Sequence, residues 1–256
     1  MPDKRRHRGP AQEDAQLFAP DRAPILAEAT AHLAWLVERG YAEKAALKLV
    51  GDRLGLRARQ RTAVLRCSAS ASACRRRRER RCGAADVRGA ALALDGFNVL
   101  TTIEAALAGG VLLLGRDGMI RDMAGMHGSW RRVEETPAAL EWIAQRLARL
   151  EPASVHWLLD QPVSNSGRLK ALIEAHGAGL TPAWTVECVP DPDPLLKVTD
   201  AVVVTADSVI LDHAVRHFDL VGSVLADIKS SGRALRLLDL SDGRTEPGRT
   251  QREDGQ

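Results

Sequence analysis

The chain has no long apolar run. None of its stretches approaches the roughly 20 consecutive apolar residues that a membrane-spanning helix needs. The basic N-terminus, MPDKRRHRGP, is not followed by the apolar segment of a secretory signal. We therefore expect a cytoplasmic protein with no membrane partner. Its 256 residues are enough to bury a substantial core in one large domain or two smaller ones.

Cysteine is scarce, and its spacing excludes the usual zinc motifs. The four cysteines stand at positions 67, 74, 82 and 188, and none forms a CxxC pair. The separations of Cys67, Cys74 and Cys82 do not fit a zinc knuckle. A reduced cytosolic chain fits this usage best.

Several nucleotide-binding and catalytic motifs are also missing. AGGVLLLGRDG has Gly110 and Gly115 at phosphate-loop spacing, but Arg116 and Asp117 stand where that loop needs Lys and Ser or Thr. No GxGxxG follows a strand, and no GxSxG nucleophile elbow is present. Haloacid-dehalogenase-like phosphatases need a second aspartate two residues after the first, where this chain has Phe97.

Charge divides the chain into a basic and an acidic part. Residues 1–90 carry a net charge of +10 and residues 91–256 a net charge of −7, so we expect an anionic partner for the first part. Composition predicts five regions, which are a flexible basic N-terminus (1–22), a small all-α helical domain (23–67), an Arg-rich linker (68–86), an α/β domain (87–240) and a disordered tail (241–256).

The α/β prediction for 87–240 comes from short apolar runs that alternate with amphipathic helices. This pattern is typical of a mostly parallel sheet. The expected strands cover residues 90–95, 154–160, 184–189, 201–205 and 234–240.

Aspartates gather where these strands end. Those at or just beyond a strand end are Asp95, Asp160, Asp191, Asp193 and Asp207, and Asp200 precedes the fourth strand. Open parallel sheets bind ligands at the carboxyl ends of their strands, and oxygen-only donors select hard ions such as Mg²⁺ or Mn²⁺. Each acid also has a simpler explanation, because Asp95 suits a turn and Asp207 suits a helix N-cap.

Two of these segments resemble signatures of the PIN-like and NYN ribonuclease superfamily. LDGFNVL resembles its first-strand motif, an apolar strand that ends in Asp-Gly-x-Asn. KVTDAVVVTADSVIL resembles its second signature, in which an acid precedes the fourth strand and Thr/Ser-x-Asp follows it. The resemblance covers roughly residues 88–225 and implies a three-layer PIN-like domain. The whole chain also resembles an uncharacterised prokaryotic family in which a helical domain of unknown function precedes such a domain.

The resemblance implies a Mg²⁺- or Mn²⁺-dependent nuclease that hydrolyses phosphodiester bonds, with RNA as the expected polymer. The implied metal-site acids are Asp95, Asp160, Asp200 and Asp207. Asp95, Asp160 and Asp207 are also the implied catalytic acids, and Asn98 would orient the cluster or the substrate. The superfamily usually carries another acid in the helix after the first strand, and Glu104 is the nearest candidate.

The segment 115–135 is long, punctuated by glycine and only weakly periodic, as functional connections often are. We expect substrate contacts from Arg116, Arg121, His127, Arg131 and Arg132, with proton transfer by His127. Trp130 would stack on a base. The simpler alternative is a surface hairpin and helix start with internal Arg–Asp pairs.

Two other functions stay open at this point. One is a nucleic-acid-binding or regulatory protein with a degenerate PIN-like site. The other is a small-molecule phosphatase or phosphotransferase, against which the basic first part argues because a small substrate does not need it.

Overall fold

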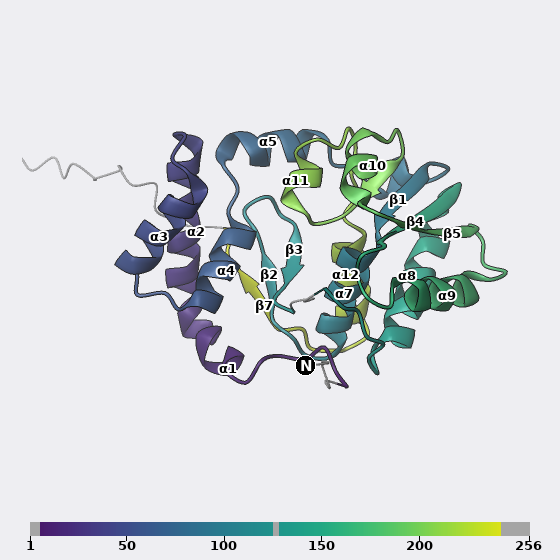
Figure 1. Cartoon of the computed structure of the whole chain (residues 1–256), viewed down its shortest axis with the longest axis horizontal. Coiled ribbons are helices and arrows are strands. Elements are labelled where there is room, and N and C mark those ends of the chain that lie inside the picture. Colours follow the sequence, from purple (N-terminus) through teal and green to yellow (C-terminus); the bar gives the residue numbers. More distant parts are fainter. Residues whose placement is uncertain (1–5, 125–127, 242–256) are drawn as a thin grey trace, which may run out of the picture.

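The computed structural model of the chain describes residues 6–124 and 128–241. In Figure 1 the N-terminal helices lie on one side, a small sheet lies in the middle, and a larger sheet with its own helices lies on the other side. The helices in the described ranges are α1 (Asp14–Leu17), η1 (Pro20–Arg22), α2 (Ala23–Glu38), α3 (Glu43–Arg53), α4 (Ala58–Cys67), α5 (Ala71–Glu79), α6 (Ala84–Val87), α7 (Gly96–Leu107), α8 (Thr136–Leu150), α9 (Ser166–Gly177), α10 (Pro192–Val198), α11 (Ser208–Leu211) and α12 (Leu220–Ser230).

The larger sheet confirms the expected mixed α/β architecture with parallel strands. Its strand order is β5-β4-β1-β6, and every neighbouring pair is parallel. The strands are β1 (Ala91–Asp95), β4 (Ser154–Asp160), β5 (Trp184–Val189) and β6 (Val202–Val204). All four lie where the apolar runs predicted strands.

Helices cover both faces of this sheet. Leu92 and Leu94 of β1 point into the main core, which also receives side chains of α7, α8, α9 and α12. Ala93, between them, points to the opposite face, where Leu196 of α10 and Ile210 of α11 pack against it. Successive strand residues alternate between faces, so these three positions define a layer of helices on each side of the sheet.

A second, smaller sheet joins the two parts of the chain. It contains β3 (Ile120–Asp122), β2 (Leu112–Leu114) and β7 (Leu237–Asp239) in that order. Leu112 of β2 faces the main core, whereas Leu113 faces the core of the N-terminal helices. The final strand expected within 234–240 therefore forms, but it pairs with β2 rather than with the larger sheet.

The helices expected in 23–67 form as α2, α3 and α4. Their buried side chains share one core with those of the small sheet: Leu26, Leu33, Val50, Val64, Leu113, Met123 and Leu238. The three helices therefore pack on the small sheet instead of forming a separate bundle.

The segment 68–86 is folded and is not the flexible linker that its composition predicted. It contains α5 and α6, and Arg77, in the middle of RRRRERR, is only 4% exposed. Its guanidinium group bonds to carboxylates far along the chain, Asp117 and Asp212. Sequence composition does not reveal such distant partners.

The expected flexible N-terminus, 1–22, is described from residue 6 onward, and this part is bound to the rest of the protein by ion pairs. Arg8 donates from Nε to a Glu104 carboxylate oxygen at 2.6 Å. The buried Asp14 accepts hydrogen bonds from Arg59 at 2.5 and 2.9 Å. At the other end, the expected tail lies outside the described residues apart from Ser241.

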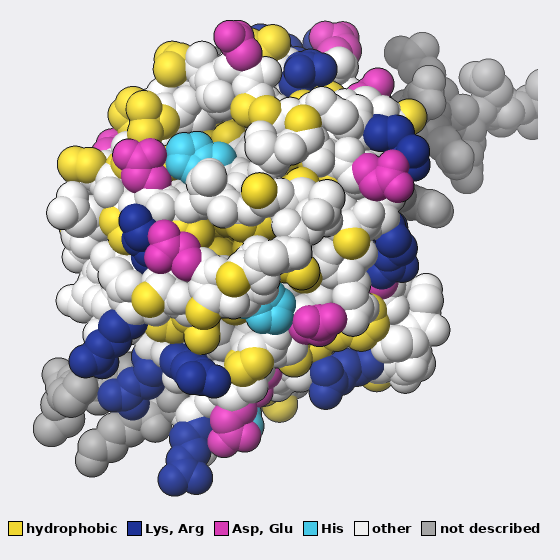
Figure 2. Space-filling model, turned by 90° about the vertical axis from the view of Figure 1, so that its right-hand side faces the viewer, with side chains coloured by type: hydrophobic (Ala, Val, Ile, Leu, Met, Phe, Trp, Pro, Cys, Tyr) yellow, Lys and Arg dark blue, Asp and Glu magenta, His cyan; other side chains and the backbone are white. Residues whose placement is uncertain are grey.

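The surface carries mixed charge. Figure 2 looks onto the side of β5 and α9, where acidic and basic side chains are interspersed and Lys and Arg gather toward the lower left. Across the described ranges, no helix is both long and apolar enough to cross a membrane.

Gly96 is required by a close approach between α7 and β4. A Cβ atom at this position would lie 2.5 Å from Cδ2 of Leu159 and 3.0 Å from the carbonyl oxygen of Leu158. The first separation is shorter than real Cβ contacts and the second is tighter than most of them, so α7 or the fully buried Leu159 side chain would have to shift. Packing therefore explains this glycine in the Asp-Gly-x-Asn motif.

We expect Gly96→Ala to lower the free energy of unfolding by about 1–3 kcal/mol, because overpacking displaces α7. Urea denaturation measures this change. Gly167→Ala is the matched control, since a Cβ there meets nothing within 4 Å, and it should change stability by less than about 1 kcal/mol. Equal stabilities of the two variants would contradict the packing argument.

Candidate functional site

Three of the aspartates predicted at strand ends line one cavity of about 770 Å³. These are Asp95, Asp160 and Asp207, and Asn98 lies with them. Side chains of α4 and α5 line the same cavity, among them Arg66, Arg76 and Arg77. The cavity thus has an acidic side built by the larger sheet and a basic side built by the N-terminal helices.

The strand register explains why the acids meet. Asp95 ends β1 directly opposite Leu158 of β4. Asp160 comes two residues after Leu158 and therefore points to the same face as Asp95. Leu94 pairs with Val204, so Thr205 continues β6 beside Asp95, and Asp207 follows two residues later. Parallel pairing brings all these positions to the carboxyl edge of the sheet.

Asp95 is held by two hydrogen bonds and has a strongly shifted pKa. Its Oδ2 accepts from the Thr205 hydroxyl at 2.8 Å, and its Oδ1 accepts from the backbone N–H of Asn98 at 3.4 Å. Burial, with a smaller contribution from the carboxylates of Asp160 and Asp207, raises the pKa of Asp95 to about 7 against the opposing effect of these bonds. Like charges are therefore crowded at this edge.

Asp207 has a structural role as well as a place in the cavity. Its Oδ1 caps α11 by accepting from the backbone N–H groups of Val209 at 2.7 Å and Ile210 at 3.1 Å. The helix-cap alternative therefore applies, yet only one of the two carboxylate oxygens is used in the cap. Asn98 supports the same loop, because its Oδ1 accepts from the backbone N–H of Ala206 at 2.9 Å.

Asp160 lies at the end of β4 and is half-buried. Burial raises its pKa, and the nearby carboxylates of Asp193 and Asp191 raise it further. Those two residues lie beyond β5, where Asp191 caps α10 by accepting from the backbone N–H of Asp193 at 3.1 Å. They do not line the cavity.

Two acids implied by the resemblance lie elsewhere. Asp200 is exposed and precedes β6, so it lies at the amino end of the strand, at the edge of the sheet opposite Asp95. Glu104 is fully buried and accepts from the Thr136 hydroxyl at 2.6 Å and from Arg8 at 2.6 Å. Neither side chain lines the cavity.

Sequence reasoning missed Asp122, which lines the cavity from β3. It is 9% exposed, and burial raises its pKa. Its Oδ2 accepts from the Thr102 hydroxyl at 2.8 Å, whereas Oδ1 has no hydrogen-bond partner among the described residues. Arg66 of α4 donates to its backbone carbonyl at 2.5 Å. No motif marks Asp122, since only the pairing of β3 with β2 carries it here.

A buried ion cluster lies beneath the cavity. The fully buried carboxylate of Asp117 accepts from Arg77 at 2.5 Å and from Arg121 at 2.7 and 2.9 Å. Burial acts to raise the pKa of Asp117, but the hydrogen bonds from Arg121 and the charges of both arginines bring it to about 2. The alternative of internal Arg–Asp pairs in 115–135 is thus realised.

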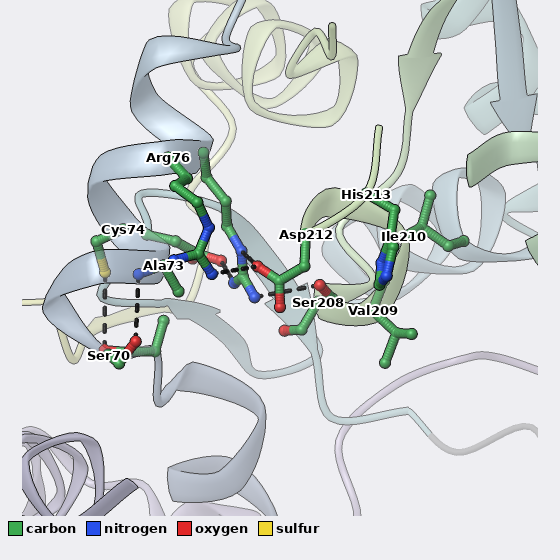
Figure 3. A network of polar contacts seen from close by, with 12 residues as sticks. Ser70, Ala73, Cys74, Arg76, Ser208, Val209, Ile210, Asp212 and His213 are labelled. Atoms are coloured by element: carbon green, nitrogen blue, oxygen red, sulfur yellow. Dashed lines mark hydrogen bonds and ion pairs between the residues drawn. The ribbon is translucent and has the colours of Figure 1, made fainter. Parts of the chain in front are cut away.

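The same two arginines hold the loop that carries Asp207. Arg121 donates from Nε to the Ala206 carbonyl at 2.9 Å, and Arg77 donates from Nη2 to the Ser208 carbonyl at 3.1 Å. Arg77 also donates to Asp212 at 2.9 Å. Figure 3 shows Asp212 and Ser208 facing the α5 side chains across this junction. Helix α5 therefore positions the loop on the acidic side of the cavity.

The other residues predicted to contact substrate are dispersed. Arg116 lies outside the cavity, with Nε at 3.3 Å from the Ala69 carbonyl. Arg131 and Arg132 are exposed and line a separate cavity, and His127 lies outside the described residues. Base stacking by Trp130 was a wrong prediction, because its side chain is 2% exposed and packs in the main core.

The arrangement of the carboxylates limits how many protein ligands one metal ion could have here. Within residues 6–124 and 128–241, no three His, Cys, Asp or Glu side chains lie close enough together to hold one. Mg²⁺ is often held by one or two carboxylates together with water and substrate phosphates. At most two of the carboxylates of Asp95, Asp160 and Asp207 therefore fit one ion, which would be shared with a phosphate-bearing substrate, and the three together do not form a closed protein site.

Comparison with known proteins places the chain in a family. Residues 84–223, more than half of the chain, match the family described as Domain of unknown function (DUF5616). The chain belongs to the DUF5616 family. Residues 25–80 match a second family, described as Protein of unknown function (DUF434). The DUF5616 segment thus contributes the acidic side of the cavity, and the DUF434 segment contributes Arg66, Arg76 and Arg77.

An uncharacterized protein of Methanocaldococcus jannaschii is 29% identical over 177 residues, which cover 69% of this chain and 84% of that protein. No solved structure matches the chain. The expected uncharacterised family with two segments is thereby confirmed. The PIN-like identity of the DUF5616 segment stays a prediction.

Asp95 should make stability depend on pH. In an unfolded chain an aspartate has a pKa of about 3.9. The folded protein keeps the Asp95 proton until about pH 7, so stability is lost as the pH rises from about 4 through 7. Relative to Asp95→Asn, the wild type should lose up to about 4 kcal/mol of unfolding free energy across this range. Urea denaturation at pH 4.5 and pH 8 measures the difference.

The control for this experiment is Asp200→Asn, which removes an exposed carboxylate outside the cavity. Other titrating groups cancel when each variant is compared with the wild type at the same pH. A difference between wild type and Asp95→Asn that stays constant with pH would contradict the shifted pKa.

Arg77 should be far more important for stability than its neighbours in the arginine run. Arg77→Gln leaves the buried Asp117 carboxylate with one arginine fewer and should cost about 3 kcal/mol of unfolding free energy. Arg78→Gln is the matched control, because Arg78 is exposed on the same helix and should change stability by less than about 0.5 kcal/mol. Similar losses in both variants, measured by urea denaturation, would argue against the buried cluster.

Proposed function

We propose that the protein hydrolyses phosphodiester bonds in RNA at the cavity between the two family segments. The observation that carries this proposal is the convergence of Asp95, Asp160 and Asp207 in one cavity that also receives arginines from α4 and α5. A phosphodiester needs both kinds of group. Arginines bind its non-bridging oxygens, and carboxylates serve proton transfer and cation binding.

The arginines on the basic side of the cavity differ in how far their donors are already used in ion pairs within the protein. Arg77 is buried in ion pairs and serves to position the Asp207 loop. Arg76 is about half exposed, and its only ion pair within the described chain is a long one, 3.9 Å to Asp212. Arg66 donates to a backbone carbonyl and forms no ion pair with a described carboxylate. Arg66 and Arg76 are therefore the side chains that we assign to phosphate binding.

Asp95 and Asp160 are the residues that we assign to a divalent ion, which would take its remaining oxygen ligands from water and phosphate. Bound there, Mg²⁺ or Mn²⁺ would activate water and stabilise the leaving oxygen. Protein side chains position the carboxyl groups. Thr205 and Asn98 hold the Asp95 carboxyl in place.

A second candidate is a nucleic-acid-binding or regulatory protein that does not cleave. The observation that favours it is the spacing of the acids, since no three of the described metal-binding side chains converge on one point. In that case the basic side of the cavity would hold a strand without cutting it.

The test is cleavage of a labelled single-stranded RNA with Mg²⁺ or Mn²⁺ by wild type, Asp95→Asn and Asp207→Asn. We expect both variants to lose at least 100-fold in rate, because each removes a carboxylate from the cavity. Asp200→Asn, at the opposite edge of the sheet, should cleave within about twofold of the wild type. Equal losses in Asp200→Asn and Asp95→Asn would contradict the assignment of the cavity.

Salt dependence separates the two candidates if no cleavage occurs. RNA binding that weakens steeply with salt, without cutting under either metal, would support the binding protein. Absence of both cutting and binding would reject both candidates.

A further inference from the structure

A second cavity, of about 410 Å³, lies beside the start of α9. Its lining is basic and contains no acidic residue: Trp130, Arg131, Arg132, Asn165, Arg168 and Leu172. Three arginines therefore border one small space. None of the three guanidinium groups forms an ion pair with a carboxylate in the described part of the chain.

Several other arginines of the fold do have carboxylate partners. Arg77 and Arg121 are neutralised by Asp117, and Arg146 and Arg149 by Asp227. Guanidinium groups that share a cavity without an acid repel one another, and a bound anion removes that repulsion. Their planar forks suit the oxygens of a phosphate group.

The floor of this cavity is fixed by hydrogen bonds. The backbone N–H of Trp130 donates to the Ser164 carbonyl at 3.0 Å, and Asn165 donates from Nδ2 to the Trp130 carbonyl at 2.9 Å. Asn165 has the left-handed backbone conformation, with φ of 70°, that turns the chain into α9. The two segments that carry the arginines are thus joined to each other.

Trp130 lines this cavity and has a buried polar atom without a partner. Its side chain is 2% exposed, and its indole Nε1 has no hydrogen-bond partner among the described residues. A buried donor without a partner is costly in a folded protein and calls for a ligand or an ordered water. The first turn of α9 adds the partial positive charge of a helix N-terminus.

Both cavities have lining residues at or just after the carboxyl end of β4. Asp160 ends β4, and the chain reaches Asn165 and α9 five residues later. The carboxyl end of β4 therefore leads into both cavities.

We propose that the cavity at Arg131, Arg132 and Arg168 binds a phosphate group of the strand that is held at the acidic cavity. The identity of that strand as RNA rests on the proposed function, whereas the recognition of phosphate rests on the arginines alone. The phosphate is either an internal one of the backbone or one at the 5′ end. These two sources share their chemistry and are separated by the choice of RNA.

The experiment measures binding by fluorescence anisotropy in the Asp95→Asn background, so that no cleavage interferes. The probes are two single-stranded RNAs of one sequence, labelled at the 3′ end and carrying either a 5′-phosphate or a 5′-hydroxyl. The variants are Arg168→Gln and the double change Arg131→Gln with Arg132→Gln. Arg53→Gln, which removes an exposed charge on α3, is the matched control.

We expect Arg168→Gln to weaken binding of the 5′-phosphorylated RNA about tenfold, with a larger loss in the double variant. The slope of log affinity against log salt should become shallower by roughly 0.7 for each phosphate contact removed. Arg53→Gln should change the affinity by less than about twofold and should leave the salt slope close to that of the wild type. Affinities and slopes of the arginine variants that match those of Arg53→Gln would overturn the proposal.

The two RNAs identify the source of the phosphate. A loss confined to the 5′-phosphorylated RNA assigns the site to a strand end, and equal losses assign it to a backbone phosphate. Wild type that binds through these arginines but never cleaves would remove the proposed function and leave the phosphate site. If the wild type cleaves RNA but its binding does not depend on these arginines, the proposed function stands and the phosphate site is rejected.

Discussion

The burial of Asp117 between Arg77 and Arg121 is the interaction on which the candidate site depends. One arginine comes from α5 in the DUF434 segment and the other from β3 in the DUF5616 segment. Burying a carboxylate is costly unless it is well paired, so the added contact from Arg77 favours docking of the two segments. Each arginine also donates to a backbone carbonyl beside Asp207, Arg121 to that of Ala206 and Arg77 to that of Ser208. Docking of the N-terminal helices is therefore coupled to the placement of Asp207 in the cavity.

The electrostatics of the cavity follow from this arrangement. Parallel strands bring Asp95, Asp160 and Asp207 to one edge, and their mutual repulsion, added to burial, keeps the pKa of Asp95 far above its usual range. Arg66 and Arg76 lie on the other side and do not contact these three carboxylates. A cavity with separated charges of both signs has room for a ligand that carries both, such as a phosphodiester with its cation. A fully collapsed cluster of ion pairs would have no such room.

Sequence patterns predicted the strands of the larger sheet because buried parallel strands are continuous apolar runs, as in Val202–Val204. They failed on α5, since its run of arginines has no apolar period and the partners of Arg77 lie 40 and 135 positions away. Trp130 was misjudged for a related reason. A tryptophan between glycines and arginines looks exposed in sequence, yet it packs in a core formed by distant helices.

The acids show most clearly what a one-dimensional pattern leaves out. Asp200 and Asp207 flank one short strand and look like a pair in sequence, but a strand separates the residues at its two ends to opposite edges of a sheet. Asp122 belongs to another sheet and carries no motif, yet its pairing through β2 brings it to the cavity. Strand polarity, rather than proximity along the chain, therefore decides which carboxylates can act together. On this reasoning strand ends bring Asp95, Asp160, Asp207 and Asp122 to the cavity from both sheets, and Glu43 of α3 and Asp212 after α11 complete its acidic lining.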